Sequence, residues 1–437
     1  MELIYRPIVG EIYAQMERNK IIILIGARQV GKTSILKLLI DKVRENEAQS
    51  SIFYFDLERE ELIEIFQSYK TLLNWLKLQG ADLDEEICLF IDEFHYIPNP
   101  TKILKILHDD FPNFRIVATG SSSLEISHRI KEALTGRKRI FHIYPLNFVE
   151  FLEFKKSPQK DILLRVKDMH SRIAKPILDD FVSDWEEFLL FGGYPKIALT
   201  QGVEEKVKEI EEIYNSYVQK DIKAFLKIGN VYAFNRLVKI LAVQIANLAN
   251  FSQIGSPLKI ARETLERYMF VLENTFIVKN LPPFFTNKKK EITKMHKIFF
   301  YDTGLRNFAI KDFKDLEFRL DKGALVENGV LAELIKATTV LQDLHFWRTQ
   351  AKTEVDIVLK DKGTLTPLEI KYQSFTVPKI PSGLKAFIEN YKPSRGYVFT
   401  KDFFGELEYQ HCRIEFIPVF MSSVVLWKGV LTGQEPF

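Results

Sequence analysis

One stretch near the amino terminus has the residue types and spacing of a phosphate-binding loop. Residues 26–33 read Gly-Ala-Arg-Gln-Val-Gly-Lys-Thr, directly after the apolar residues 21–25 and before an apolar-patterned segment. Glycines let backbone N–H groups surround phosphate oxygens, a lysine brings positive charge to the β and γ phosphates, and a threonine hydroxyl can ligate Mg²⁺. The sequence therefore predicts a site for a nucleoside triphosphate, lined by Gly26, Ala27, Arg28, Gln29, Val30, Gly31, Lys32, Thr33 and Ser34.

Two carboxylates, Asp92 and Glu93, follow the apolar run 87–91. At the end of a buried strand beside the loop, Asp92 would hold Mg²⁺ directly or through water, and Glu93 would polarise the attacking water. An acidic pair at a strand end is also common in plain solvated loops. The presence of the glycine-rich loop favours the catalytic interpretation, and His95 is expected to be structural.

Hydroxyl groups follow the next apolar run. Residues 118–122 read Ala-Thr-Gly-Ser-Ser, and either Ser121 or Ser122 is expected to orient water near the γ-phosphate. A hydroxyl-rich turn is the alternative.

A parallel sheet would position these groups. Short apolar runs alternate with helical patterns, which predicts an α/β domain with helices on both faces of the sheet. The five expected strands are 21–25, 51–55, 87–91, 115–118 and 139–143.

Further carboxylates and a lysine lie near the carboxyl end. A helix at 323–338 carries Glu327 and Glu333, and strands are expected at 344–348, 354–359 and 365–371, followed by a helix near 383–391 and a strand near 396–400. Alternation along a strand sends Glu369 and Lys371 to one face, and Asp356 comes from the neighbouring strand. Such a set can hold divalent cations and position a nucleophile. We expect Glu327, Asp356 and Glu369 as metal ligands and interpret Glu333 as a surface residue.

The middle of the chain is mainly helical. Helical patterns run from 148 to about 226, interrupted by a turn at Gly192-Gly193. Helical patterns at 234–248 and 260–272, with a short segment at 251–254 between them and a strand at 273–278, have the order of a winged helix. Its surface would offer Lys259, Arg262, Glu263, Arg267, Tyr268, Lys288, Lys289, Lys290 and Lys294 to DNA phosphates. Packing or partner contact is the equal alternative.

Composition limits the classes of protein. The 437 residues suggest about three domains, the formal net charge is only +3, and there are two cysteines, of which Cys88 is expected to be buried. Any nucleic-acid surface must therefore be a local patch. No apolar stretch reaches the roughly 18 residues that span a bilayer, so we expect a cytoplasmic protein without membrane contact.

The glycine-rich loop, Asp92-Glu93-Phe94-His95-Tyr96 and Gly136-Arg137 resemble a prokaryotic group of AAA-type P-loop ATPases. The resemblance implies ATP and Mg²⁺ as ligands, a homo-oligomer with an AAA-type interface, and an arginine finger, for which Arg137 is the first candidate and Arg139 the second. It also implies that 146–228 is a helical lid over the nucleotide, to which Tyr217 to Ile222 contribute. The segments expected are 1–145 (P-loop ATPase), 146–228 (lid), 229–300 (winged helix) and 301–437.

The last segment resembles the PD-(D/E)xK nuclease core, a restriction-endonuclease-like α/β fold. Asp356, Glu369 and Lys371 match its motif, and Glu327 supplies the helix carboxylate. The resemblance implies that Mg²⁺ or Mn²⁺ would serve there if the site is active. The first hypothesis is an ATPase that acts on DNA, which the last segment binds or cleaves. The second is an ATP-switched signalling or assembly ATPase whose last segment only contacts protein partners.

Overall fold

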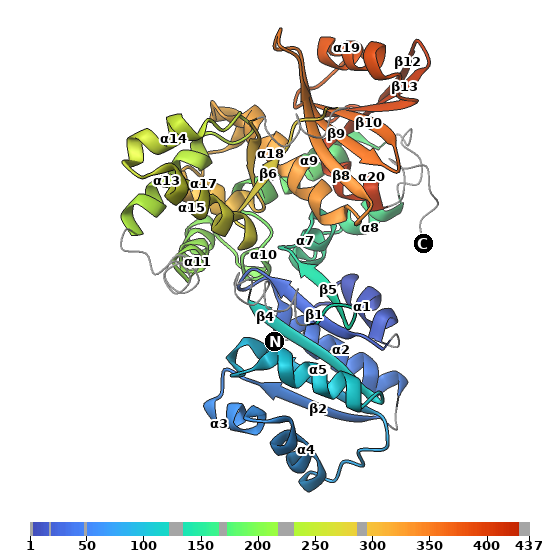
Figure 1. The fold of residues 1–437 in the computed structure, drawn as a ribbon. Helices are drawn as coiled ribbons and strands as arrows, with labels where there is room; N and C mark the ends of the chain where they lie inside the picture. Colours follow the sequence, from blue (N-terminus) through green and yellow to red (C-terminus); the bar gives the residue numbers. More distant parts are fainter. Residues whose placement is uncertain are drawn as a thin grey trace. The chain divides into compact units, whose positions relative to one another are not determined.

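The computed structural model describes residues 3–16, 19–47, 50–121, 134–165, 173–216, 231–285 and 295–427. The chain forms two compact units (Figure 1). The first consists mainly of residues 1–144 and includes 274–276, and the second contains most of residues 145–437. Each unit has its own sheet and core, and each is considered separately below.

The first unit is built on a five-stranded parallel sheet. Its strands are β1 (Ile21–Gly26), β2 (Ser51–Asp56), β3 (Ile87–Asp92), β4 (Phe114–Ser121) and β5 (Lys138–Ile143). They lie in the order β2-β3-β4-β1-β5. Strands β1 and β3 are buried along their whole length, as expected for strands covered on both faces. All five strands predicted from the sequence are confirmed.

Crossover handedness distributes the helices of this unit. The helices are α1 (Ile8–Met16), α2 (Lys32–Asn46), α3 (Glu60–Ile63), α4 (Tyr69–Leu78) and α5 (Pro100–Asp110). The chain moves from β1 out to β2 through α2 and returns from β3 to β4 through α5. Because both crossovers between parallel strands are right-handed, α2 and α5 lie on opposite faces. Helix α1 packs on α2, and α4 packs on α5.

The second unit begins with the helices α7 (Phe148–Lys155), α8 (Gln159–Arg165), α9 (Lys175–Phe191), α10 (Pro195–Leu199) and α11 (Val203–Ser216). The helical prediction is thus confirmed over the described part of this segment, whereas 217–222 lies outside the described residues. Helix α7 begins with a capping box between Asn147 and Glu150.

The double glycine between α9 and α10 is a turn, as predicted. Gly192 has φ +81°, and a Cβ there would lie 2.2 Å from Asp302 Oδ1. Asp302 occupies that space, where its Oδ2 accepts a hydrogen bond from Gly193 N at 2.8 Å. The turn is therefore tied to the start of helix α17 (Thr303–Ile310), for which Asp302 is the N-cap.

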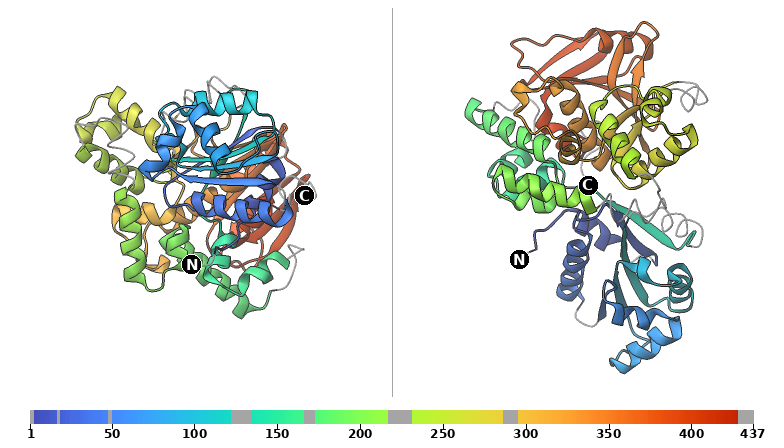
Figure 2. Two further views of the ribbon diagram at one scale, coloured as in Figure 1. Left: turned by 90° about the horizontal axis from the view of Figure 1, so that it is seen from below. Right: turned by 90° about the vertical axis from the view of Figure 1, so that its left-hand side faces the viewer.

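Three helices and a hairpin follow. These are α13 (Val231–Val243), α14 (Phe251–Leu258), α15 (Arg262–Asn274) and the antiparallel strands β6 (Val278–Leu281) and β7 (Lys297–Phe300). Helix α13 packs against α17 and β7 at one side of the second unit (Figure 2). The predicted strand at 273–278 is wrong in its start, because α15 runs to Asn274 and the chain reverses at Phe276, where φ is +59°. The lysines 288, 289, 290 and 294 lie outside the described residues.

A six-stranded mixed sheet completes the second unit. Its strands are β8 (Gln342–Arg348), β9 (Glu354–Asp361), β10 (Thr364–Lys371), β11 (Arg395–Thr400), β12 (Gly405–Tyr409) and β13 (Cys412–Pro418), in the order β12-β13-β11-β10-β9-β8. The helices with it are α18 (Lys322–Ala337), α19 (Ser382–Tyr391) and α20 (Ser422–Trp427). The predicted helix, three strands, helix and strand are confirmed. Strands β12 and β13 were not expected from the sequence.

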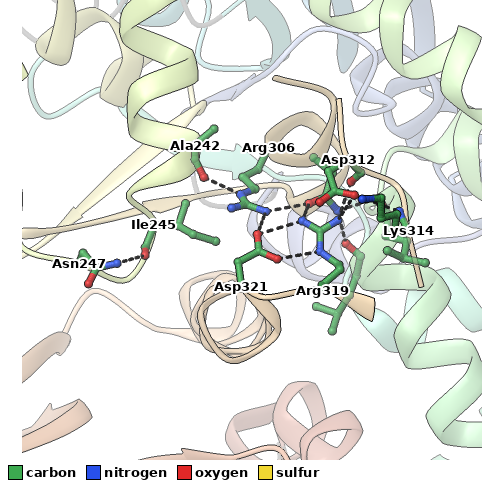
Figure 3. Close-up of polar contacts among 11 residues, drawn as sticks. Ala242, Ile245, Asn247, Arg306, Asp312, Lys314, Arg319 and Asp321 are labelled. Carbon is green, nitrogen blue, oxygen red and sulfur yellow. Dashed lines mark hydrogen bonds and ion pairs between the residues drawn. The ribbon is translucent and has the colours of Figure 1, made fainter. Parts of the chain in front are cut away.

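A buried ionic network joins helices of the second unit (Figure 3). Asp321 accepts from Arg319 Nε at 2.9 Å and lies 2.6 Å from Arg306 NH1. Arg306 Nε donates at 2.7 Å to the carbonyl of Ala242, in α13. The network thus connects α13, α17 and the start of α18 through two arginines that have almost no exposed surface.

Candidate nucleotide site and a carboxylate and lysine cluster

The glycine-rich loop has the backbone geometry that its sequence predicts. Gln29 and Gly31 both have positive φ, +60° and +92°. A Cβ on Gly26 would lie 2.1 Å from the carbonyl oxygen of Ile143, so only glycine fits where β1 ends beside β5. Lys32 begins α2 and is buried, with Nζ donating to the carbonyls of Gly26 and Ala27 at 3.1 and 2.8 Å. The lysine is thus held inside the loop at the amino end of a helix.

Arg6 supports this loop from outside the motif. Its guanidinium is buried and donates to the carbonyl of Val30 at 2.9 Å and to that of Tyr144 at 3.2 Å. One side chain therefore joins the loop to the end of β5. Sequence reasoning missed Arg6, and the only signal was the Arg6-Pro7 pair shortly before the first helix.

Asp92, at the end of β3, is fixed by two hydroxyl groups. Thr119 Oγ1 donates to Asp92 Oδ1, and Tyr54 OH lies 3.4 Å from Asp92 Oδ2. Thr119 Oγ1 also accepts from Glu93 N at 2.9 Å. Among the described side chains at the end of β4, the Thr119 hydroxyl contacts the acidic pair. The side chain of Ser121 and all of Ser122 lie outside what the structure describes, so their role stays a prediction.

Glu93 faces the loop lysine. The residue has left-handed backbone geometry, φ +53°, and its Oε2 lies 3.1 Å from His95 Nδ1. Burial by itself would raise the pKa of Glu93, but the contact with His95 and the charges of Lys32 and Arg28 hold that pKa below its ordinary value. Glu93 is therefore ionised at neutral pH, as a group that polarises water requires. His95, expected to be structural, contacts this group directly.

The residues expected to hold Mg²⁺ have the correct chemistry. Thr33 follows Lys32 at the start of α2, and the buried Asp92 ends β3 in the same unit. Hydroxyl and carboxylate oxygens are the ligands that Mg²⁺ prefers, and the rest of its shell is usually water and phosphate. The donor set therefore fits Mg²⁺.

Arg137 lies at the far end of the sheet from the loop of its own chain. Its carbonyl accepts from Ile21 N, at the start of β1, whereas the loop follows the end of this six-residue strand. That separation is about 20 Å at the usual rise per residue. Arg137 Nε donates to Asp109 Oδ1 at 2.6 Å. Arg139 contacts Gln15. Neither arginine belongs to the site of its own chain.

The second unit brings Asp356, Glu369 and Lys371 together. Asp356 on β9 and Glu369 on β10 face each other one step beyond the paired residues Ile357 and Leu368. Lys371 Nζ donates to Glu369 Oε1 at 2.7 Å, and Asp356 Oδ2 accepts from Ile370 N at 2.8 Å. Burial, reinforced by the neighbouring charge of Asp356, raises the pKa of Glu369 to about 7. The expected side-chain set therefore converges.

Glu327 is also part of this cluster, but a lysine contacts it. Lys297 Nζ, from β7, lies 3.0 Å from Glu327 Oε1 and 2.5 Å from Glu354 Oε1. Burial raises the pKa of Glu327 to about 8, although the charge of Lys297 opposes this shift. Within the described ranges, no three Cys, His, Asp or Glu side chains are arranged to hold a metal ion. The expected three-carboxylate set of Glu327, Asp356 and Glu369 therefore does not fit a divalent cation in this arrangement.

The interpretation of Glu333 as a surface residue is wrong. Its carboxylate is fully buried, accepts from Phe148 N at 2.7 Å and pairs with Lys336 Nζ at 2.9 Å. Helix α18 packs against β10 on one side and against α9 on another. The Glu333 side chain, which points away from the cluster, is therefore covered as well. Glu333 caps the start of α7 and is not part of the cluster.

Three successive segments of the chain match family models of known proteins. Residues 18–152 match the family model of an AAA domain, 182–316 a domain of unknown function (DUF8612), and 322–417 another (DUF4143). The first unit is an AAA-type ATPase domain. The two remaining matches carry no description of function.

Two of the similar proteins are described only as uncharacterized. An uncharacterized protein of Methanocaldococcus jannaschii, MJ1544, is 29% identical over 80% of this chain and 74% of its own. An uncharacterized protein of Haemophilus influenzae is 28% identical over 66% of this chain and 68% of its own. Among solved structures, a RuvB of Thermotoga maritima covers 64% of this chain and 90% of its own at 16% identity and a TM-score of 0.29, which is too distant to bear on function.

In the second unit, the surface around the start of α15 carries both cations and carboxylates, and Arg262 Nε pairs with Glu266 Oε1 at 2.8 Å. Lys259, Arg262 and Arg267 are exposed. Tyr268, expected at this surface, is buried against Phe234 at a ring distance of 5.4 Å and is unavailable to a partner. In the described part of the chain, no helix is both long enough and apolar enough to cross a membrane.

Proposed function

We propose that the AAA domain hydrolyses ATP with Lys32 and Glu93 as the main catalytic residues. The observation that supports this is that the loop holds the buried Lys32 at the start of α2, while Asp92 and Glu93 lie at the end of β3 in the same parallel sheet. Lys32 would neutralise charge on the β and γ phosphates, and Glu93 would accept a hydrogen bond from the attacking water. Thr33 and Asp92 would hold Mg²⁺, which neutralises phosphate charge when bound.

The surrounding residues position these groups. Arg6 fixes the loop, Thr119 orients Asp92, and His95 holds Glu93. The backbone N–H groups of residues 26–34 at the start of α2 would bind phosphate oxygens. Burial of Lys32 and Asp92 strengthens their attraction to phosphate and cation, because less water screens them.

The test separates binding from hydrolysis. Lys32→Ala is expected to lower ATP turnover by about 100-fold or more. Glu93→Gln is expected to retain ATP binding while hydrolysis is lost, because the amide cannot accept a proton from water. Lys77→Ala, at an exposed position of α4, is the matched control and should hydrolyse ATP normally. Normal turnover by Lys32→Ala would rule out the proposed site.

We also propose that Arg137 completes the site of a neighbouring copy in a homo-oligomer. Its position far from the loop of its own chain, partly exposed beside Asp109, supports action in trans. If so, Arg137→Ala and Lys32→Ala, each inactive alone, should regain part of the turnover when mixed. Arg139→Ala is the control and should hydrolyse ATP normally. Normal turnover by Arg137→Ala alone would contradict the proposal.

For the second unit we propose contact with DNA. The support is three exposed cations in and just before α15, together with a sheet in which β8, β9 and β10 are antiparallel and β11 is parallel to β10, the order expected of a nuclease-like domain. Lys259, Arg262 and Arg267 would neutralise backbone phosphates. The contact of Lys297 with Glu327 favours binding over cleavage by this unit.

Salt dependence tests this contact. DNA affinity should fall steeply as salt rises, and Arg262→Glu with Arg267→Glu should weaken binding and reduce the slope of log K against log salt by about one unit for each phosphate that is no longer neutralised. Lys208→Glu, an exposed lysine of α11 paired with Glu205, is the charge-matched control. Absence of DNA binding by the unmodified chain would favour a signalling or assembly ATPase that contacts protein partners.

A further inference from the structure

Lys297 is an internal cation among carboxylates from several elements. Its side chain is 2% exposed, and its Nζ lies 3.0 Å from Glu327 of α18 and 2.5 Å from Glu354 of β9. The negative charge of Asp356 also acts on it. The lysine comes from β7, whose residue 297 pairs with Leu281 of β6. Strand β7 therefore places a positive charge beside β9 of the six-stranded sheet.

Nζ of Lys297 lies where a metal ion bound by Glu327 and Glu354 would lie. An ammonium group and a metal ion both bind carboxylate oxygens, so the oxygens that point at Nζ cannot also ligate a metal. A surface lysine can turn away, but Lys297 is buried and its backbone is held in a strand. A divalent cation can reach Glu327 and Glu354 only if Lys297 leaves.

Charge balance leads to the same conclusion. The cluster contains the carboxylates Glu327, Glu354, Asp356 and Glu369. Against them stand Lys297, Lys371 and Arg348, whose NH1 lies 2.8 Å from Glu354 Oε2. Removing Lys297 would leave only Lys371 and Arg348 beside these four carboxyl groups. In addition, Glu369 is 5% exposed, and its Oε2 is a buried atom without a hydrogen-bond partner.

We propose that Lys297 occupies the cation position of this cluster and excludes divalent cations from it, so that Lys297→Met converts the cluster into a divalent-cation site. The new site would use oxygens of Glu327 and Glu354, with Asp356 and Glu369 adjacent. This inference goes beyond the proposed function, and it depends neither on ATP hydrolysis nor on DNA binding.

The experiment measures Mn²⁺ binding to the full chain without nucleotide, by calorimetry and by the loss of the free Mn²⁺ electron-spin signal. Lys297→Met is expected to bind one more Mn²⁺ than the unmodified chain, at least ten times more tightly than any weak site there. Its melting temperature should rise on addition of Mn²⁺. Because the readout is binding, the result does not depend on any catalytic activity.

Lys336→Met is the matched control. Lys336 is another nearly buried lysine that pairs with a buried carboxylate, Glu333, at 2.9 Å in the same unit. Its removal should lower the melting temperature without creating a Mn²⁺ site, because Glu333 Oε2 stays bound to the amide of Phe148. The double variant Lys297→Met with Glu327→Gln should lose the added Mn²⁺.

Two results would overturn the inference. Equal Mn²⁺ binding by the unmodified chain and by folded Lys297→Met would show that the lysine does not exclude the metal, and retention of the added ion by the double variant would show that Glu327 is not a ligand. If Lys297→Met does not fold, Lys297→Gln, which keeps a hydrogen-bond donor at the position, is measured against the same criteria. DNA binding by the unmodified chain is assayed on the same samples, so failure of the proposed DNA contact is distinguishable.

Discussion

Thr119 Oγ1, on β4, donates a hydrogen bond to the carboxylate of Asp92, at the end of β3. The same hydroxyl accepts from Glu93 N at 2.9 Å. The Thr119 hydroxyl thus donates one hydrogen bond and accepts another, which a side chain without a hydroxyl cannot do. The threonine therefore fixes the orientation of the carboxylate expected to hold Mg²⁺ and the start of the turn that carries the expected catalytic glutamate.

Thr119→Val should impair ATP turnover more than folding. Valine has the same shape but leaves Asp92 Oδ1 and Glu93 N without this partner, at a cost of about 1–3 kcal/mol. We expect turnover to fall by about tenfold or more, with a higher Mg²⁺ concentration needed for half-maximal turnover. Steady-state ATPase assays across Mg²⁺ concentrations provide the measurement. Thr366→Val, at a buried strand position in the second unit, is the control, and equal turnover in both variants would contradict the role of Thr119.

Arg6→Lys should loosen the phosphate-binding loop. The guanidinium contacts two carbonyl groups that lie far apart in sequence, Val30 and Tyr144, and a single ammonium group cannot reproduce that geometry. We expect nucleotide affinity to fall several-fold and the AAA domain to lose about 1–3 kcal/mol of unfolding free energy. Fluorescent-nucleotide titration and urea unfolding measure the two effects. Arg44→Lys, an exposed arginine of α2, should change neither.

Local sequence patterns were enough to predict the elements that carry the site, but contacts between distant residues were not. The loop at Gly26 and the carboxylates at Asp92 adjoin apolar runs whose length and composition define buried strands, so these residues could be placed on a parallel sheet. Arg6 and Lys297 could not be found in this way. Each has a side chain that reaches residues at least 24 positions away, and nothing in the neighbouring sequence marks that reach.

Glu333 illustrates the same limit within one helix. The apolar pattern of α18 defines one buried face, so a glutamate off that face looked solvent-exposed. The helix is in fact covered on a further side by α9. Helical periodicity shows which residues share a face but not how many faces other elements cover.

Glu47 should make the stability of the first unit depend on acid pH. The hydrogen bonds from Arg115, one of them 3.1 Å long, hold the pKa of Glu47 below its ordinary value of about 4.5 in the fold, against the opposing effect of burial. A carboxyl with a lowered folded pKa contributes stability that is fully present above the unfolded pKa and is lost as pH falls through the folded one. The stabilising effect should therefore disappear progressively below about pH 4.5.

The variant Glu47→Gln tests this dependence. Its unfolding free energy should lie below that of the unmodified chain at pH 7, and the difference should shrink as the pH is lowered through 4.5 toward 3. Urea unfolding at each pH, followed by a probe in the first unit, gives both values. Glu61→Gln, at an exposed position of α3, should show no such difference. A difference that stays constant with pH would contradict the assignment.

Asp321→Asn should strongly destabilise the second unit. Its carboxylate neutralises both Arg306 and Arg319, whose guanidinium groups are almost fully buried (Figure 3). Removal of one partner from a buried ionic group typically costs about 3–5 kcal/mol. Asp312→Asn is the matched control and should cost under about 1 kcal/mol, because Asp312 contacts Arg319 mainly through its backbone carbonyl. Thermal unfolding of the two variants measures the difference, and equal losses would show that Asp321 is not the main counter-charge.

Gly192→Ala should disrupt the turn between α9 and α10 more than its backbone angle alone requires. Gly192 has φ +81° and ψ −175°, a region essentially restricted to glycine, where another residue costs about 1–3 kcal/mol. At this position the added Cβ would also lie 2.2 Å from Asp302 Oδ1, so Asp302 would have to leave the amide of Gly193 that it accepts from. Gly202 has an almost identical φ, +82°, with nothing within 4 Å of its Cβ position. Gly202→Ala is therefore the control for a substitution at positive φ without a close contact, and urea unfolding should show a larger loss for Gly192→Ala. If the two variants lose the same stability, the contact with Asp302 contributes little.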